Sequence, residues 1–187
     1  MGNIILFNKP YNVLSQFTDK GNYKEQRQTL SDFISHKGFY AAGRLDKDSE
    51  GLLVLTNDGI LQAKISNPKY KLKKTYWTQV EGIPTEEGLH TLRNGILLSD
   101  GKSLPASVRI IKKPLSLWKR RPPIRYRKHI NETWLEIILS EGKNRQIRRM
   151  TAAIGNPTLR LIRYGIGDWS IDGLAVGNYL KIDAANK

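Results

Sequence analysis

The most regular stretch of the chain is an apolar run at residues 52–55, which follows a polar loop and precedes a turn at Asp58-Gly59. Consecutive apolar residues bounded by turn residues are typical of a buried strand. Apolar residues then recur at helical spacing from Ile60 to Ile65, and Asp58 is in position to cap a short helix there. The pattern predicts a loop, a buried strand, a turn and a helix in succession.

Strand signals dominate the rest of the chain. The pattern predicts strands at residues 3–7, 39–42, 75–80, 96–98, 108–111, 133–139 and 158–164, and helices at residues 29–34, 84–94 and 143–154. Residues 96–98 and 108–111 are expected to pair through turns, and residues 169–182 to complete the sheet as a hairpin-like tail. Many strands and few short helices favour an α+β fold with a mixed, mainly antiparallel central sheet and flanking short helices.

The charge balance points to a polyanionic partner. A formal charge of +14 and a pI near 10.0 exceed what solubility requires. Nucleic acid fits best, because the chain has neither a long apolar stretch nor an amphipathic helix with a continuous basic face for a membrane. The start of the chain has no charged leader before a cleavable apolar segment, so we expect a cytoplasmic protein.

Composition also limits the chemistry. The chain has no cysteine, which excludes disulfides and thiolate chemistry and is compatible with a reducing compartment. The three histidines are far apart and show no ligand spacing, so no metal site is expected. A length of 187 residues fits one domain, with two lobes around a shared core as the alternative.

Two basic segments contain aromatic residues. Residues 69–74 lead into a predicted strand with Tyr76 and Trp77, which suits phosphate contacts next to base stacking. Residues 118–129 form the densest basic segment, and its two prolines keep it from forming a helix, so an extended loop that projects guanidinium groups is expected. For both segments the alternative is a solvated charged surface.

Asp46 lies beside Arg44 in the polar loop before the buried strand. Most aspartates in such loops only shape turns or contact solvent. A carboxylate held among many cations stays ionised, however, and an ionised, positioned carboxylate can act as a nucleophile. In the predicted helix at residues 143–154, Arg148 falls near the edge of the buried stripe, from where it can reach along the core or extend to water.

The stretch GRLDKDSEGLLVLTNDG, residues 43–59, resembles the catalytic motif of the RNA pseudouridine synthases, in the branch that modifies bacterial ribosomal RNA at single uridines. Further matching segments follow in the family's order: NKP at 8–10, KTY at 74–76 and EGKNRQIRRM at 141–150. The resemblance covers nearly the whole chain. It departs at Ser49, where the family usually has threonine, and after Pro10, where many relatives have glycine.

The resemblance implies a single catalytic domain over residues 1–187, with a bent sheet, an RNA-binding cleft and no separate N-terminal RNA-binding domain. It implies that one uridine of 23S rRNA is isomerised to pseudouridine by base flipping. The expected partner is 23S rRNA or a large-subunit assembly intermediate. The protein is expected to act as a monomer, away from membranes. The reaction neither gains nor loses atoms, so no cofactor is expected.

The resemblance also assigns roles to residues. Asp46 would be the nucleophile, attacking C1′ of the sugar or C6 of the base, and Arg148 would hold its carboxylate through a charge-assisted hydrogen bond. Tyr76 would stack on the flipped base and relay the C5 proton, and Arg44 would occupy the vacated space. The remaining residues expected to contact RNA are all basic: Lys9, Lys74, Arg120, Arg121, Arg125, Arg127, Lys143, Arg145 and Arg149.

Two other functions fit parts of the pattern. A ribosome-assembly factor with the same fold and a dead site would bind RNA without turnover, although it would be expected to have lost Asp46, Tyr76 or Arg148. A DNA-binding or surface-binding domain would explain the charge, but the chain has no recognition-helix motif and no zinc pattern.

Overall fold

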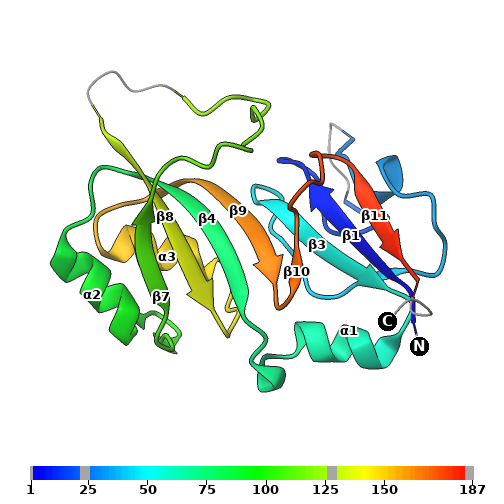
Figure 1. The fold of residues 1–187 in the computed structure, drawn as a ribbon, viewed down its shortest axis with the longest axis horizontal. Coiled ribbons are helices and arrows are strands. Elements are labelled where there is room, and N and C mark those ends of the chain that lie inside the picture. The colour runs from blue at the N-terminus through cyan, green and yellow to red at the C-terminus, as the bar shows by residue number, and fades with distance from the viewer. Residues whose placement is uncertain (1, 22–25, 126–129, 184–187) are drawn as a thin grey trace. The chain divides into compact units, whose positions relative to one another are not determined.

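The computed structural model describes residues 2–21, 26–125 and 130–183 (Figure 1). The chain divides into two compact units: unit 1 is Met1–Leu72 with Arg163–Lys187, and unit 2 is Lys73–Ile162. The boundary falls inside strand β9 (Thr158–Ile166), so one strand contributes to both units. The expected α+β class with mainly antiparallel pairing is confirmed.

Unit 1 is built around two central strands. Its elements are β1 (Ile4–Lys9), η1 (Leu30–Asp32), β2 (Tyr40–Ala41), β3 (Glu50–Thr56), α1 (Gly59–Ser66), η2 (Pro68–Tyr70), β10 (Trp169–Ser170) and β11 (Tyr179–Ile182). β1 lies between β11 and β3 and pairs antiparallel with both, so that Ile4 is opposite Ile182 and Thr56. All seven residues of β3 are buried, which explains its continuous apolar run.

The turn after β3 confirms the predicted helix cap. The Asp58 carboxylate accepts hydrogen bonds from the backbone N–H groups of Ile60 and Leu61, at 2.9 and 3.1 Å. These bonds lower the pKa of Asp58, the bond from Leu61 contributing most, because they favour its charged form. The first turn of α1 is thereby satisfied, and the chain reverses immediately after the buried strand.

Unit 2 packs two helices on one face of its sheet. Its elements are β4 (Lys74–Glu81), α2 (Glu86–Asn94), β5 (Leu97–Leu98), β6 (Gly101–Lys102), β7 (Ser107–Ile111), β8 (Glu132–Leu139), α3 (Gln146–Ala153) and the first part of β9. The strand order is β9-β4-β8-β7. Leu92 from α2 and Met150 from α3 are completely buried in a core shared with Val80, Leu135 and Ile137.

Two predicted pairings were wrong. Residues 97–98 do not pair with β7: β5 pairs with β6 across a tight turn, and β7 pairs with β8. The apolar side of β7 explains this choice, because Val108 lies opposite Ile137 and both side chains are buried. The expected hairpin-like tail also separates, since β10 pairs with β9 whereas β11 pairs with β1.

The third helix begins later than predicted. Residues 143–145 form a turn, and α3 starts at Gln146 because Arg145 has a left-handed backbone, with φ of 47°. The Gln146 side chain accepts a hydrogen bond from the Lys143 N–H at 3.0 Å and thereby closes this turn. The predicted buried stripe is present, since Ile147 and Met150 are buried and Ile154 packs against them at the end of the helix.

Candidate active site

Asp46 lies in the polar loop between β2 and β3 of unit 1. It is half-buried, the preceding Leu45 is buried and Arg44 is exposed. The Asp46 carbonyl accepts a hydrogen bond from the Ser49 N–H at 3.0 Å, which closes a turn directly before β3. The sequence therefore holds the backbone at Asp46 between a buried residue and a buried strand, while the side chain stays partly accessible.

The segment after β1 fastens this loop on both sides of Asp46. The Ser15 hydroxyl donates to the Leu45 carbonyl at 2.7 Å and accepts from the Leu45 N–H at 3.1 Å. The Asn12 N–H donates to the Lys47 carbonyl at 2.8 Å. Ser15 is buried, so its two bonds are shielded from water. Sequence reasoning missed Ser15, because a single serine gives no sign of a partner thirty residues away.

Lys9 is completely buried, and its ammonium donates to the carbonyls of Pro10 and Val13 at 3.0 and 2.7 Å. The expected contact with RNA is therefore corrected: a side chain sealed under the surface cannot reach a phosphate. Burial lowers the pKa of Lys9 to about 7, against the attraction of the nearby Glu50, Asp48 and Asp46 carboxylates. Its position indicates that Lys9 stabilises the turn that carries Asn12 and Ser15.

The low pKa of Lys9 predicts a pH-dependent stability. Between pH 7 and the ordinary value of 10.5, the unfolded chain holds a proton that the folded protein has released. The free energy of unfolding should therefore rise with pH over this range, by up to about 1.4 kcal/mol per pH unit. Urea denaturation at several pH values should show this rise for the unmodified protein and not for Lys9→Met. Parallel stability curves for the two proteins would contradict it.

Unit 2 contains the other two expected catalytic residues. Alternation along β4 places Tyr76 on the same face as Val80, and Tyr76 belongs to the core cluster that includes Ile147 and Met150 of α3. Only 9% of Tyr76 is exposed. Arg148 stands between Ile147 and Met150 in sequence and is half-buried at the edge of this cluster. Tyr76 and α3 therefore share one face of the sheet of unit 2.

Two residues that were expected to contact RNA have partners inside unit 2. Arg149 forms a bidentate pair with Asp100, at 2.8 and 2.9 Å, which raises the pKa of Arg149 and lowers that of Asp100. The Lys143 ammonium donates to the carbonyls of Asp100, Gly101 and Lys102 at 3.3 to 3.4 Å. Both cations thus hold the β5–β6 hairpin near the start of α3. Arg145 is exposed in the turn beside them.

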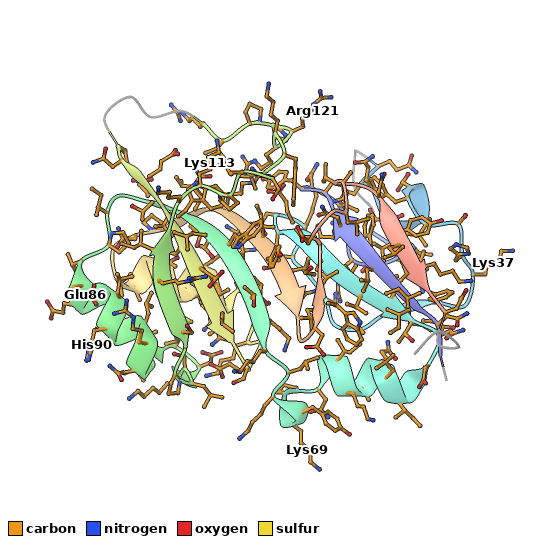
Figure 2. The ribbon with its side chains drawn as sticks, in the orientation of Figure 1. Lys37, Lys69, Glu86, His90, Lys113 and Arg121 are labelled. Atoms are coloured by element: carbon orange, nitrogen blue, oxygen red, sulfur yellow. The ribbon has the colours of Figure 1, made fainter. Side chains whose placement is uncertain are left out.

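The remaining basic residues lie along the connection between β7 and β8, and at the start of β4. Arg121 and Arg125 are exposed, and Figure 2 shows Arg121 pointing away from the ribbon. Arg120 donates to the carbonyls of Pro122 and Leu159, at 2.9 and 3.4 Å. Lys74 is half-buried at the first position of β4. Arg127 falls outside the described residues.

Within residues 2–21, 26–125 and 130–183, no three histidine, cysteine, aspartate or glutamate residues cluster as metal ligands would. No helix in this part of the chain is long and apolar enough to cross a membrane.

Comparisons with known proteins agree on one family. Residues 3–153 match the family model described as RNA pseudouridylate synthase. The chain is 60% identical to a protein of Vibrio vulnificus, over 96% of this chain and 74% of that protein, and 54% identical to one of Xanthomonas axonopodis pv. citri, over 92% and 90%. Both relatives are named ribosomal large subunit pseudouridine synthase E.

A solved structure supports the same assignment. The crystal structure of a pseudouridylate synthase matches 99% of this chain and 72% of its own, with a TM-score of 0.78 and 28% sequence identity. The family model, the curated relatives and the solved structure therefore all indicate the same family. The chain belongs to the RNA pseudouridylate synthase family and is an RNA pseudouridine synthase.

Proposed function

We propose that this enzyme isomerises a single uridine of 23S ribosomal RNA to pseudouridine, with Asp46 as the nucleophile. The substrate follows from the two relatives of 54% and 60% identity, which are named for the large ribosomal subunit. The observation that carries the proposal is the Asp46 loop, whose backbone is bonded through both neighbours of Asp46 while the carboxylate stays partly accessible. A ribosomal RNA substrate places the enzyme in the cytoplasm, either on free 23S rRNA or on an assembly intermediate.

The reaction balances without any added group. The bond from C1′ to N1 breaks, the base turns, C1′ joins C5, and the proton on C5 leaves while one returns to N1. A carboxylate nucleophile divides this exchange into two steps through a covalent adduct. Asp46 attacks either C1′ of the sugar or C6 of the base. In both routes the carboxylate must be ionised and fixed in direction, and a loop bonded on both sides fixes the backbone that carries it.

The other residues support that step. Arg148 supplies the positive charge that stabilises the ionised nucleophile, and Tyr76 stacks on the extruded base and relays the C5 proton, as the resemblance of their motifs implies. The core that surrounds Tyr76 supports this role, because packing holds the ring in one orientation. Arg44, which is exposed near Asp46 in sequence, fills the space that the base leaves. Its contacts there offset the cost of unstacking the base, roughly a few kcal/mol.

Binding of the RNA chain falls to exposed cations. Arg121 and Arg125 project from the connection between β7 and β8, and Arg145 from the turn before α3. Contacts of this kind go to phosphates, so they fix the register of the RNA without reading its sequence. Their contribution to affinity falls as the salt concentration rises.

The direct test is tritium release. 23S rRNA transcribed with C5-tritiated uridine is incubated with the purified enzyme, and release of tritium to water reports exchange at C5. We expect about one tritium per RNA molecule, since one site is modified. Mapping pseudouridine in rRNA from cells with and without the gene then identifies the position. RNA binding without any release would favour the assembly-factor alternative, and preferential binding to duplex DNA would favour a DNA-binding domain.

A further inference from the structure

The connection between β7 and β8 takes an unusual route. Its described part, residues 112–125, contains six cations and no acidic residue, and we call it the basic segment. β7 is the last strand in the order β9-β4-β8-β7, yet the basic segment makes its contacts at β9. It therefore spans three strand spacings, roughly 14 Å, instead of turning directly into β8. Figure 1 shows it as a long connection without helix or strand.

One buried residue holds the basic segment at this distance. The Arg160 guanidinium donates to the Trp118 carbonyl at 3.0 Å and lies over the Trp118 ring, 5.3 Å from its centroid. Arg160 is 5% exposed, so its cation–π contact is shielded from water. Such contacts are strongest when they are desolvated. The neighbouring Leu161 is in the core with α2 and α3, and alternation therefore turns Arg160 to the other face of the sheet.

A second contact continues the attachment. Arg120 donates to the carbonyl of Leu159, the residue before Arg160. Five of the six cations of the basic segment are exposed: Lys112, Lys113, Lys119, Arg121 and Arg125. The other exposed residues of the segment are uncharged, and they include Leu115 and Ser116. Figure 2 shows Lys113 and Arg121 on this part of the chain. A segment without helix or strand keeps its cations in fixed positions only if other contacts offset the conformational entropy that it loses on ordering.

We propose that Arg160 is the anchor that fixes the basic segment across the sheet and so holds its exposed cations as a preformed surface for the phosphate backbone of RNA. Arg160 itself makes no contact with RNA; it is a positioning residue. The choice of RNA as the partner depends on the proposed function. Charge complementarity supports it, because six cations without a carboxylate complement a polyanion such as the phosphate backbone.

The experiment compares three variants. Arg160→Met removes both anchor contacts, and Trp118→Leu removes the ring contact while it keeps the backbone carbonyl that accepts from Arg160. Arg121→Ala removes the same single charge as Arg160→Met from an exposed position. Affinity for a 23S rRNA transcript is measured over a range of salt concentrations. Arg121→Ala should reduce the slope of log K against log salt by about one, with a loss of about threefold in affinity. Both anchor variants should lose about tenfold or more and reduce the slope by about two or more, since several phosphate contacts loosen together.

A second measurement does not involve RNA. Trypsin should cut within residues 112–125 faster in both anchor variants than in the unmodified protein or in Arg121→Ala. The double variant Arg160→Met/Trp118→Leu should be no worse than Arg160→Met alone, because the Trp118 ring has already lost its guanidinium partner in that single variant. If Arg160→Met does not fold, which its unfolding midpoint will reveal, Trp118→Leu provides the test, because that side chain is only half-buried.

The outcomes separate the two proposals. Equal affinity losses for Arg160→Met and Arg121→Ala, with unchanged cleavage by trypsin, would show that only charge matters and would overturn the anchor. Faster cleavage with no added loss of RNA affinity would overturn the RNA surface. Absence of tritium release by the unmodified enzyme would instead count against the proposed function, while the trypsin comparison would still report on the anchor.

Discussion

Asp46→Asn should abolish pseudouridine formation while leaving the enzyme folded and bound to RNA. We expect turnover to fall by about 1,000-fold or more, as is typical when the nucleophile is removed from a group of catalytic residues that act together. Affinity for RNA should change by less than about threefold, because phosphate contacts supply most of the binding. Tritium release under single-turnover conditions measures the first quantity, and filter binding measures the second.

Asp48→Asn is the matched control for this substitution. It makes the same change of charge two residues later in the same half-buried loop. If the carboxylate of Asp46 acts chemically, only the substitution at position 46 should stop turnover, and Asp46→Ala should behave as Asp46→Asn does. Turnover retained in both Asp46 variants would remove Asp46 as nucleophile. A similar loss in Asp48→Asn would mean that the loop needs its negative charge but not one particular carboxylate.

Gly51→Ala should unfold unit 1 or weaken it severely. Gly51 has φ of +98°, and an added Cβ would lie 2.3 Å from the Arg163 carbonyl oxygen in the adjacent strand. The left-handed backbone alone costs an alanine about 1–2 kcal/mol, and overpacking against fixed backbone adds about 1–3 kcal/mol. We therefore expect about 3 kcal/mol or more of lost stability in urea denaturation.

Gly38→Ala separates these two contributions. Gly38 also lies in unit 1 with a positive φ, +80°, but no described atom lies within 4 Å of the position that its Cβ would occupy. It should lose only the backbone part, about 1–2 kcal/mol. Equal losses for the two variants would show that β3 and β9 move apart to admit the extra methyl group. The close approach would then not be what reserves position 51 for glycine.

Local signals in the sequence were reliable where one short stretch decides the structure. The apolar run became β3, Asp58 caps α1, and Tyr76 shares a buried face of β4 with Thr78 and Val80 as the alternation predicted. Each of these features depends on neighbours in sequence; the Asp58 carboxylate, for example, accepts from the N–H of Ile60, two residues later. The stretch at residues 43–59 that resembles the family's catalytic motif is also local, so family and reaction could be identified before the fold was known.

Other features depended on partners that no local pattern reveals. The pairing of β7 with β8 is decided by the burial of Val108 against Ile137, which lie far apart in the chain. The later start of α3 is decided by the left-handed backbone of Arg145, which a basic residue gives no reason to expect. Lys9 illustrates the same limit, because its charge indicated a surface position whereas carbonyls and nearby carboxylates accommodate it inside.

The pairing of β11 with β1 has a consequence for the order of folding during synthesis. Unit 2 is one continuous stretch, Lys73–Ile162, and can fold as soon as that stretch has left the ribosome. Strand β1 precedes that stretch in the chain, yet it receives its outer partner only when residues 179–182 have been translated. Until then one hydrogen-bonding edge of an apolar strand stays open in the nascent chain, a state in which chaperones bind and misassembly begins. Strand β1 is therefore completed only after all of unit 2 has been translated.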